Sequence, residues 1–190
     1  VILRHSDMAW AHCAGITPHT HAAKVHARSL NAFQQMRDTL ASRGFTYDQV
    51  IRTWLYLGDI VGPEGETQRY KELNRARTEF YKDTRFLPRN LAPSVDGAVY
   101  PASTGIGASD HDVMMSCIAL ATERKDILLV PLENPLQISA FDYGQEYSPK
   151  SPKFSRAMAV VGPEVVSILV SGTASIVNAE TRFLDDVEGQ

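Results

Sequence analysis

Short segments that favour β-strands alternate along this chain with two segments of amphipathic helical pattern. Apolar residues recur at helical spacing over 22–43, where Gly44 stands as a residue that ends a helix, and again over 66–82. The segments 49–58 and 113–121 are apolar runs, and the first is rich in β-branched and aromatic residues. This alternation predicts an α/β layer sandwich in which two helices cover one face of a sheet.

Further strands are expected towards both ends of the chain. Residues 8–16 form a short apolar run that predicts a buried strand, and 1–5 pair with it as a hairpin through Ser6-Asp7. Additional strands are predicted over 127–130, 157–161 and 165–170.

Composition limits the classes of function. The chain has 190 residues, 44% of them hydrophobic, and a formal net charge of −3. Without a basic surplus, nucleic acid is not an expected partner. Apolar runs stay below the roughly 20 residues that cross a bilayer, so no membrane association is expected. Cys13 and Cys117 lie in apolar segments, which favours reduced core thiols and a cytoplasmic location.

The stretch 133–180 alternates polar, proline-stiffened segments with short apolar strands. Because proline restricts its own backbone and that of the residue before it, 148–152 (SPKSP) is predicted to be a stiff loop. Such a loop presents cationic and hydroxyl groups at a fixed place, here beside the turn Ser171-Gly172-Thr173. The alternative is a surface connection between strands.

Several histidines lie near the N-terminus, but their spacing does not match that of a zinc site. We therefore expect neither a metal nor another cofactor. The histidines concerned are His5, His12, His19, His21 and His26.

Local motifs give the chain a family resemblance. A long helix follows Gly15-Ile16-Thr17-Pro18, and 148–157 (SPKSPKFSRA) pairs with 170–175 (VSGTAS) after the segment 133–140 (ENPLQISA). With these motifs the chain resembles the Rid (YjgF) superfamily, and within it the chorismatase-like branch that carries two Rid-like domains in tandem. Some members of the superfamily carry the label endoribonuclease L-PSP, which the acidic net charge argues against here.

The resemblance implies a fold and a domain organisation. The fold is an α/β (α+β) layer sandwich of the bacillus chorismate-mutase-like type, with one mixed sheet covered on one face by two helices. We expect a first Rid-like domain over 1–125, a linker and loop over 126–152, and the truncated start of a second Rid-like domain over 153–190. Rid-like domains leave one sheet face uncovered, which implies a homo-oligomer with trimer-type sheet packing.

The resemblance also implies an activity, the hydrolytic cleavage of the enol ether of chorismate, or of a related cyclic carboxylic acid, to pyruvate and a hydroxylated ring acid. The partner is thus a small anionic carboxylic acid. The active site would lie mainly in the second domain and be incomplete in this chain, with the main acid expected beyond Gln190. Cleaving a vinyl ether requires a general acid and a dry, oriented pocket.

Candidate site residues follow from that chemistry. Arg156 is the expected anchor for a substrate carboxylate, because a guanidinium matches a carboxylate bidentately. Tyr147 and Ser155 are expected to hydrogen-bond the substrate, while Gly172 and Thr173 let the backbone approach it. Glu180 is the candidate acid or base within the chain. Most of these residues also have a structural interpretation. Arg156 would then be an exposed arginine at a strand edge and Tyr147 a packed tyrosine. Gly172 and Thr173 would form a plain turn, and Glu180 would be a solvated loop glutamate.

Two other functions stay open. Deaminating Rid enzymes carry a substrate-gripping arginine in a local Pro-Ala-Arg-Ser pattern, whereas this chain reads Pro101-Ala102-Ser103 at the matching place. An enamine or imine deaminase is therefore a weaker alternative. A non-catalytic Rid protein that binds small carboxylates or serves assembly is the other.

Overall fold

The structure is a computed structural model of the chain. It describes residues 1–20, 24–109, 112–142, 151–173, 175–178, 180–183 and 185–189. Within these residues, no helix is both long and apolar enough to cross a membrane.

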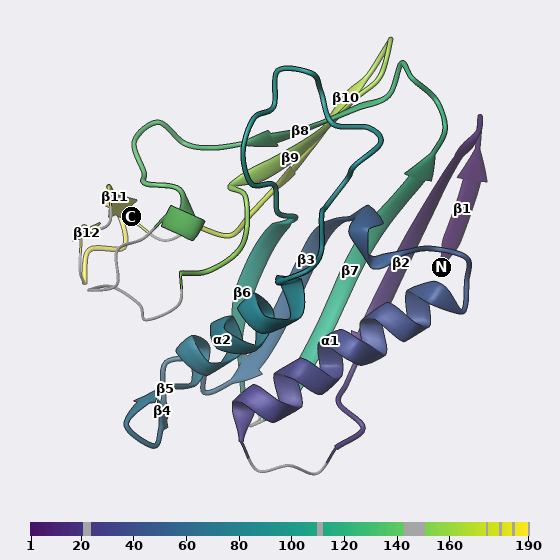
Figure 1. Ribbon diagram of the computed structural model, residues 1–190. Helices are drawn as coiled ribbons and strands as arrows, with labels where there is room; N and C mark the ends of the chain where they lie inside the picture. Colours follow the sequence, from purple (N-terminus) through teal and green to yellow (C-terminus); the bar gives the residue numbers. More distant parts are fainter. Residues whose placement is uncertain are drawn as a thin grey trace.

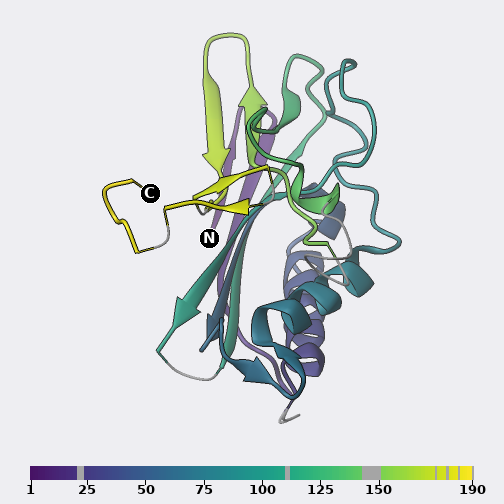
Figure 2. The ribbon, with the colours of Figure 1, turned by 90° about the vertical axis from the view of Figure 1, so that its left-hand side faces the viewer.

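A five-stranded mixed sheet forms the centre of the molecule (Figure 1). The β3–β6 pair is parallel, and the other three pairs are antiparallel. The predicted mixed sheet with two helices on one face is confirmed, as the side view in Figure 2 makes clear. In spatial order the strands are β1 (Ile2–His5), β2 (Met8–Ile16), β7 (Val113–Thr122), β3 (Val50–Gly58) and β6 (Ala102–Ala108); the helices are α1 (Val25–Ala41) and α2 (Arg69–Tyr81).

The core lies between this sheet and the helices. Alternate residues of β3, Ile51 and Leu55 among them, are fully buried on the helix side. Phe33 of α1 and Leu73 of α2 are fully buried as well. Because successive strand residues point to opposite faces, Trp54 lies on the other side of the sheet and stays partly exposed. The sequence pattern of β3 thus separates a packed face from an open one.

Two features differ from the sequence prediction. The second helix begins at Arg69 rather than at 66, because the short strands β4 (Pro63–Glu64) and β5 (Thr67–Gln68) form a hairpin before it. Strand β6 was not predicted, since its sequence ASTGIGA is small and glycine-rich. Gly105 is needed there, because a Cβ would come within 2.9 Å of the Tyr70 ring.

A second, three-stranded antiparallel sheet follows in the order β10-β9-β8. Strand β8 (Leu128–Leu132) confirms the strand predicted over 127–130, which lies in the segment expected as linker and loop. It pairs with β9 (Ala157–Val161), which pairs in turn with β10 (Val166–Val170). The strands predicted over 157–161 and 165–170 are confirmed. The short elements are η1 (Tyr47–Gln49), η2 (Ala140–Asp142), β11 (Ile176–Val177) and β12 (Glu180–Thr181).

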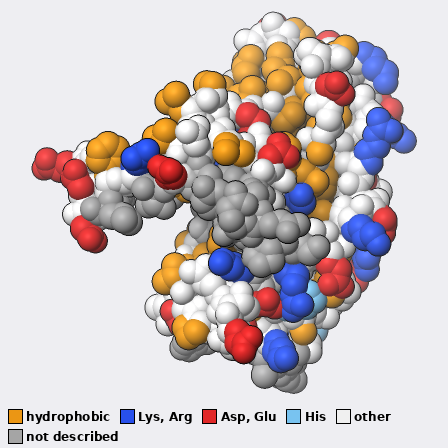
Figure 3. All heavy atoms as spheres, turned by 60° about the vertical axis from the view of Figure 1, so that its left-hand side comes forward, with side chains coloured by type: hydrophobic (Ala, Val, Ile, Leu, Met, Phe, Trp, Pro, Cys, Tyr) orange, Lys and Arg blue, Asp and Glu red, His pale blue; other side chains and the backbone are white. Residues whose placement is uncertain are grey.

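The outer strand of this second sheet, β10, is exposed. Val166, Ile168 and Val170 of β10 are each more than half exposed. Strand β10 lies at the top of Figures 1 and 2, and apolar side chains also gather at the top of the face in Figure 3.

Candidate functional site

The segment that leads into β9 runs beside the edge strand β6. Ser155 forms an isolated parallel bridge with Ala102, and its backbone N–H donates to the carbonyl of Pro101 at 3.2 Å. Ser155 is only 1% exposed. The predicted site segment is therefore attached to the first sheet next to Ser103, the position that the sequence comparison matched to the arginine of the deaminase pattern.

Ser171 ties the two halves of the candidate site together. Its hydroxyl donates to the carbonyl of Ser155 at 2.6 Å and accepts the backbone N–H of Ser103 at 2.8 Å. Its own N–H donates to the carbonyl of Arg156 at 2.8 Å. Buried groups gain from such pairing because an unsatisfied donor or acceptor is costly. The structure thus brings together Ser155, Arg156 and the turn that begins at Ser171.

Arg156 is held in a largely buried position, 9% exposed. Its Nη2 donates to the carbonyl of Ile138 at 3.2 Å, and its Cζ lies 5.4 Å from the centroid of the Phe154 ring. Its backbone N–H donates to Glu133 Oε1 at 3.3 Å. The interpretation of Arg156 as a solvated arginine at a strand edge does not fit this burial.

Glu133 is a carboxylate near this cluster that sequence reasoning missed. Burial raises the pKa of Glu133 above its ordinary value, although the backbone N–H and positive charge of Arg156 act in the opposite direction. The signal was available, because Glu133 opens the ENPLQISA segment that carries the family resemblance. Its proximity to Arg156 arises from the β8–β9 pairing, which sequence alone does not reveal.

Gly172 lies against the first sheet. Its N–H donates to Thr104 Oγ1 at 2.7 Å, and Arg52 Nη2 donates to the same oxygen. A Cβ at Gly172 would overlap the Thr104 side chain. The backbone of Gly172 is therefore in close contact with Thr104.

Arg52 adds a second buried cation to this region. It is 4% exposed, and its Cζ lies 4.5 Å from the Trp54 ring. Desolvation by burial lowers the pKa of Arg52 to about 10. Cation–π contact partly offsets the cost of burying such a charge.

The other predicted site residues lie in different settings. Thr173 Oγ1 lies 3.5 Å from Gln137 Oε1, and Gln137 Nε2 donates to the carbonyl of Ile176 at 2.8 Å. Glu180 is exposed and pairs with Arg182 at 2.9 Å. Tyr147 lies outside the described residues.

A hollow of about 1060 Å³ lies elsewhere, beside the β1–β2 turn and the end of β7. Its lining carries balanced charge, from Arg4, Arg89 and Arg124 against Asp7, Asp48 and Glu123. An anionic ligand would therefore gain little net electrostatic attraction in this hollow.

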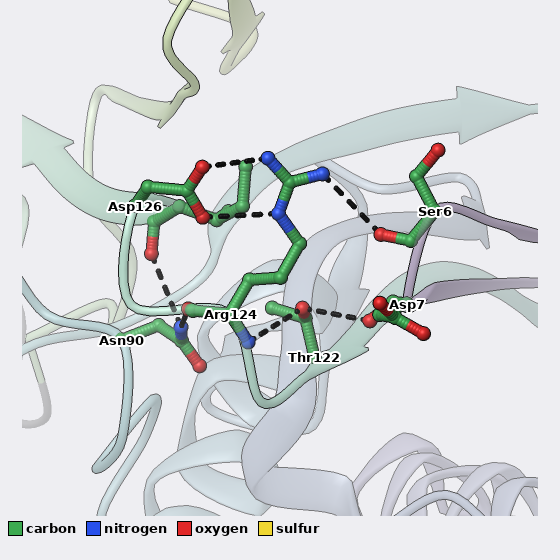
Figure 4. A network of polar contacts seen from close by, with 7 residues as sticks. Ser6, Asp7, Asn90, Thr122, Arg124 and Asp126 are labelled. Carbon is green, nitrogen blue, oxygen red and sulfur yellow. Dashed lines mark hydrogen bonds and ion pairs between the residues drawn. The ribbon is translucent and has the colours of Figure 1, made fainter.

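Several residues that line this hollow belong to a polar network, whose contacts are shown in Figure 4. Arg124 pairs bidentately with Asp126 and donates to the carbonyl of Ser6 at 3.3 Å. Thr122 Oγ1 donates to the carbonyl of Asp7 at 2.9 Å, and Asn90 donates to the carbonyl of Arg124 at 3.0 Å. The network fastens the β1–β2 turn to the end of β7, which is a structural task.

Comparison with known proteins places this geometry in a family. Residues 2–121 match the family described as Chorismatase FkbO/Hyg5-like, N-terminal. The chain is 30% identical to a chorismatase of Streptomyces rapamycinicus, over 98% of this chain and 53% of that protein. It is 28% identical to a 3-hydroxybenzoate synthase of Streptomyces hygroscopicus, over 97% and 51%. The chain thus spans about half the length of these curated relatives.

A crystal structure of a chorismatase has the same fold, with a TM-score of 0.69 at 24% identity. The match covers 100% of this chain and 52% of that one.

Proposed function

This chain belongs to the FkbO/Hyg5-like chorismatase family, and on that premise we propose that the full-length protein hydrolyses the enol ether of chorismate or of a related cyclic carboxylic acid. The products are pyruvate and a hydroxylated ring acid. The chorismatase and 3-hydroxybenzoate synthase among the relatives support this reaction class. We place the active site mainly in a second Rid-like domain that begins near Lys153.

The buried guanidinium of Arg156 carries the proposal. An arginine with its backbone fixed by Ser171 and its Nη2 fixed by Ile138 is oriented before a ligand arrives. Pre-orientation reduces the entropy lost when a carboxylate binds. A guanidinium in a poorly solvated place also attracts an anion more strongly than one in water. Arg156 is therefore the proposed anchor for one substrate carboxylate.

The reaction then requires a proton on the methylene carbon of the enol ether. Water adds to the resulting oxocarbenium, and the hemiketal collapses to pyruvate and the ring alcohol. Ser155, Gly172, Thr173 and Tyr147 are proposed to contact the substrate. Glu180 already pairs with Arg182 on an exposed hairpin. We therefore propose that the main proton donor of the full-length protein corresponds to a residue in the half of the relatives' length that this chain does not match.

Product analysis tests the proposed reaction. Full-length protein incubated with chorismate is expected to release pyruvate in step with a hydroxylated ring acid, measured by coupled lactate dehydrogenase and by chromatography. Chorismate that stays intact while the protein still binds it would favour the non-catalytic carboxylate-binding alternative.

We also propose a cytoplasmic homo-oligomer with trimer-type sheet packing. The open face of the main sheet supports this assembly, since Met114 is 37% exposed there and Trp54 is only half-buried. Light scattering on the full-length protein measures the state directly, and a monomer at micromolar concentration would exclude the assembly.

A further inference from the structure

One aromatic ring contacts two buried arginines. The Cζ atoms of Arg77 and Arg156 each lie 5.4 Å from the centroid of the Phe154 ring. Phe154 is 8% exposed and Arg77 is 1% exposed. Guanidinium contacts with an aromatic face are stronger when they are desolvated, as they are here.

Arg77 belongs to the first layer sandwich, on helix α2. Its Nη1 donates to Ser103 Oγ at 3.2 Å, and its Nη2 donates to Asn74 Oδ1. Ser103 Oγ in turn accepts the hydroxyl of Thr53 at 2.8 Å. Because each partner is buried, the Arg77 guanidinium has a fixed place between α2 and β6.

Phe154 and Arg156 come from the segment that leads into the second sheet. The backbone N–H of Ser155, which lies between them, donates to the carbonyl of Pro101. Pro101 precedes Ser103 by two positions in the chain. The ring of Phe154 therefore lies in contact both with the fixed guanidinium of Arg77, in the first sandwich, and with the guanidinium of Arg156.

We propose that Phe154 is a positioning residue for Arg156, and that Arg77 holds the Phe154 ring from the other element. The proposal rests on the proposed function in one respect, namely that Arg156 anchors a carboxylate. Two cations on one ring also repel each other, and an anion at Arg156 relieves that repulsion. The stack therefore both orients the anchor and favours its occupation by an anion.

Binding of benzoate to the full-length protein, measured by calorimetry, tests this role without requiring turnover. Phe154→Leu removes the ring and is expected to weaken benzoate binding about five- to thirtyfold, the range of a buried cation–π contact. Phe154→Tyr keeps the ring and is expected to stay within about twofold of the wild type. Phe141→Leu is the matched control, since that ring packs on Tyr100, and it is expected to bind benzoate like the wild type.

A spectroscopic measurement reports the stack itself. Ring currents of Phe154 are expected to shift the Nε–H resonances of Arg77 and Arg156, and Phe154→Leu removes both shifts while Phe154→Tyr keeps them. Phe154→Met replaces the leucine variant if the latter does not fold.

Benzoate affinity that is unchanged in Phe154→Leu overturns the proposal, as does an equal loss in the leucine and tyrosine variants. A folded wild-type protein that binds no benzoate overturns it too. The proposed reaction fails separately if the predicted binding pattern is found but chorismate yields no pyruvate.

Discussion

The backbone N–H of Gly172 donates to the side-chain oxygen of Thr104 at 2.7 Å, which joins the turn after β10 to the edge strand of the main sheet. Arg52 donates to the same oxygen. One threonine thus connects a glycine of the candidate site to a buried cation of the first sandwich.

Replacing that glycine should loosen this junction. Gly172→Ala is expected to destabilise the protein by about 1–3 kcal/mol, because its Cβ overlaps the Thr104 side chain and forces a shift. Urea unfolding followed by circular dichroism measures the loss.

Two further variants define the cause. Gly162→Ala is the matched control, since a Cβ there meets its nearest atoms at 3.4 Å, an ordinary contact. Thr104→Ser removes the methyl group that Gly172→Ala strikes and keeps the acceptor oxygen, so the double variant should recover part of the loss. Equal stability of Gly172→Ala and Gly162→Ala would contradict the overlap.

Leu55 tests the packing of the main sheet against the helices. The residue is fully buried, and Leu55→Ala is expected to lower the free energy of unfolding by about 2–5 kcal/mol through lost burial and the cavity left behind. Val61→Ala, at a residue that is 75% exposed, should change it by less than about 0.5 kcal/mol. Similar values for the two variants would mean that Leu55 is not packed as described.

Glu133 predicts a pH dependence of stability. Its pKa in the folded protein is raised by burial above the ordinary 4.5. A raised pKa means that folding favours the protonated form, so this contribution is fully present below pH 4.5 and is lost as pH rises through the folded-state pKa. Glu133→Gln does not titrate, so its stability relative to the wild type should improve between pH 4 and pH 7. A difference between the two proteins that stays constant over this range would contradict the assignment.

The two cysteines predict a difference in reactivity. Cys13 and Cys117 lie directly opposite each other on β2 and β7, and a hydrogen bond from the Cys117 thiol lowers the pKa of Cys13. Because the thiolate is the reactive form, Cys13 should react with iodoacetamide faster at pH 7 than an ordinary thiol of equal exposure. Cys117→Ala removes the donor and should slow the reaction, as mass spectrometry of the labelled peptide would measure. An unchanged rate in that variant would exclude the hydrogen bond as the cause.

Sequence patterns predicted the parts of the fold that local propensity controls. Helical periodicity predicted the helix that ends before Gly44, and β-branched content predicted the strand over 50–58. These predictions hold because the local preference of each segment agrees with the place that the core gives it. Strand β6 escaped prediction because its sequence is rich in Ala and Gly, which are depleted in strands, and its pairing with β3 is decided by tertiary packing.

Part of the grouping of residues at the candidate site was predictable from the sequence, whereas the contacts that fix these residues were not. Ser155, Arg156 and the turn after β10 were expected to lie together, and they do. The contacts that fix them, from Glu133, Phe154 and Thr104, join residues that pairing and packing bring together. Sequence spacing contains no information on such contacts.

Turnover of chorismate by the full-length wild type and by Arg156→Lys and Arg156→Met tests the central claim most directly. Lysine keeps the charge but not the planar fork, and methionine removes both. If Arg156 anchors the carboxylate, pyruvate release should show kcat/KM reduced at least about tenfold in the lysine variant and further in the methionine variant. If both variants fold and release pyruvate with the same kcat/KM as the wild type, the account is contradicted.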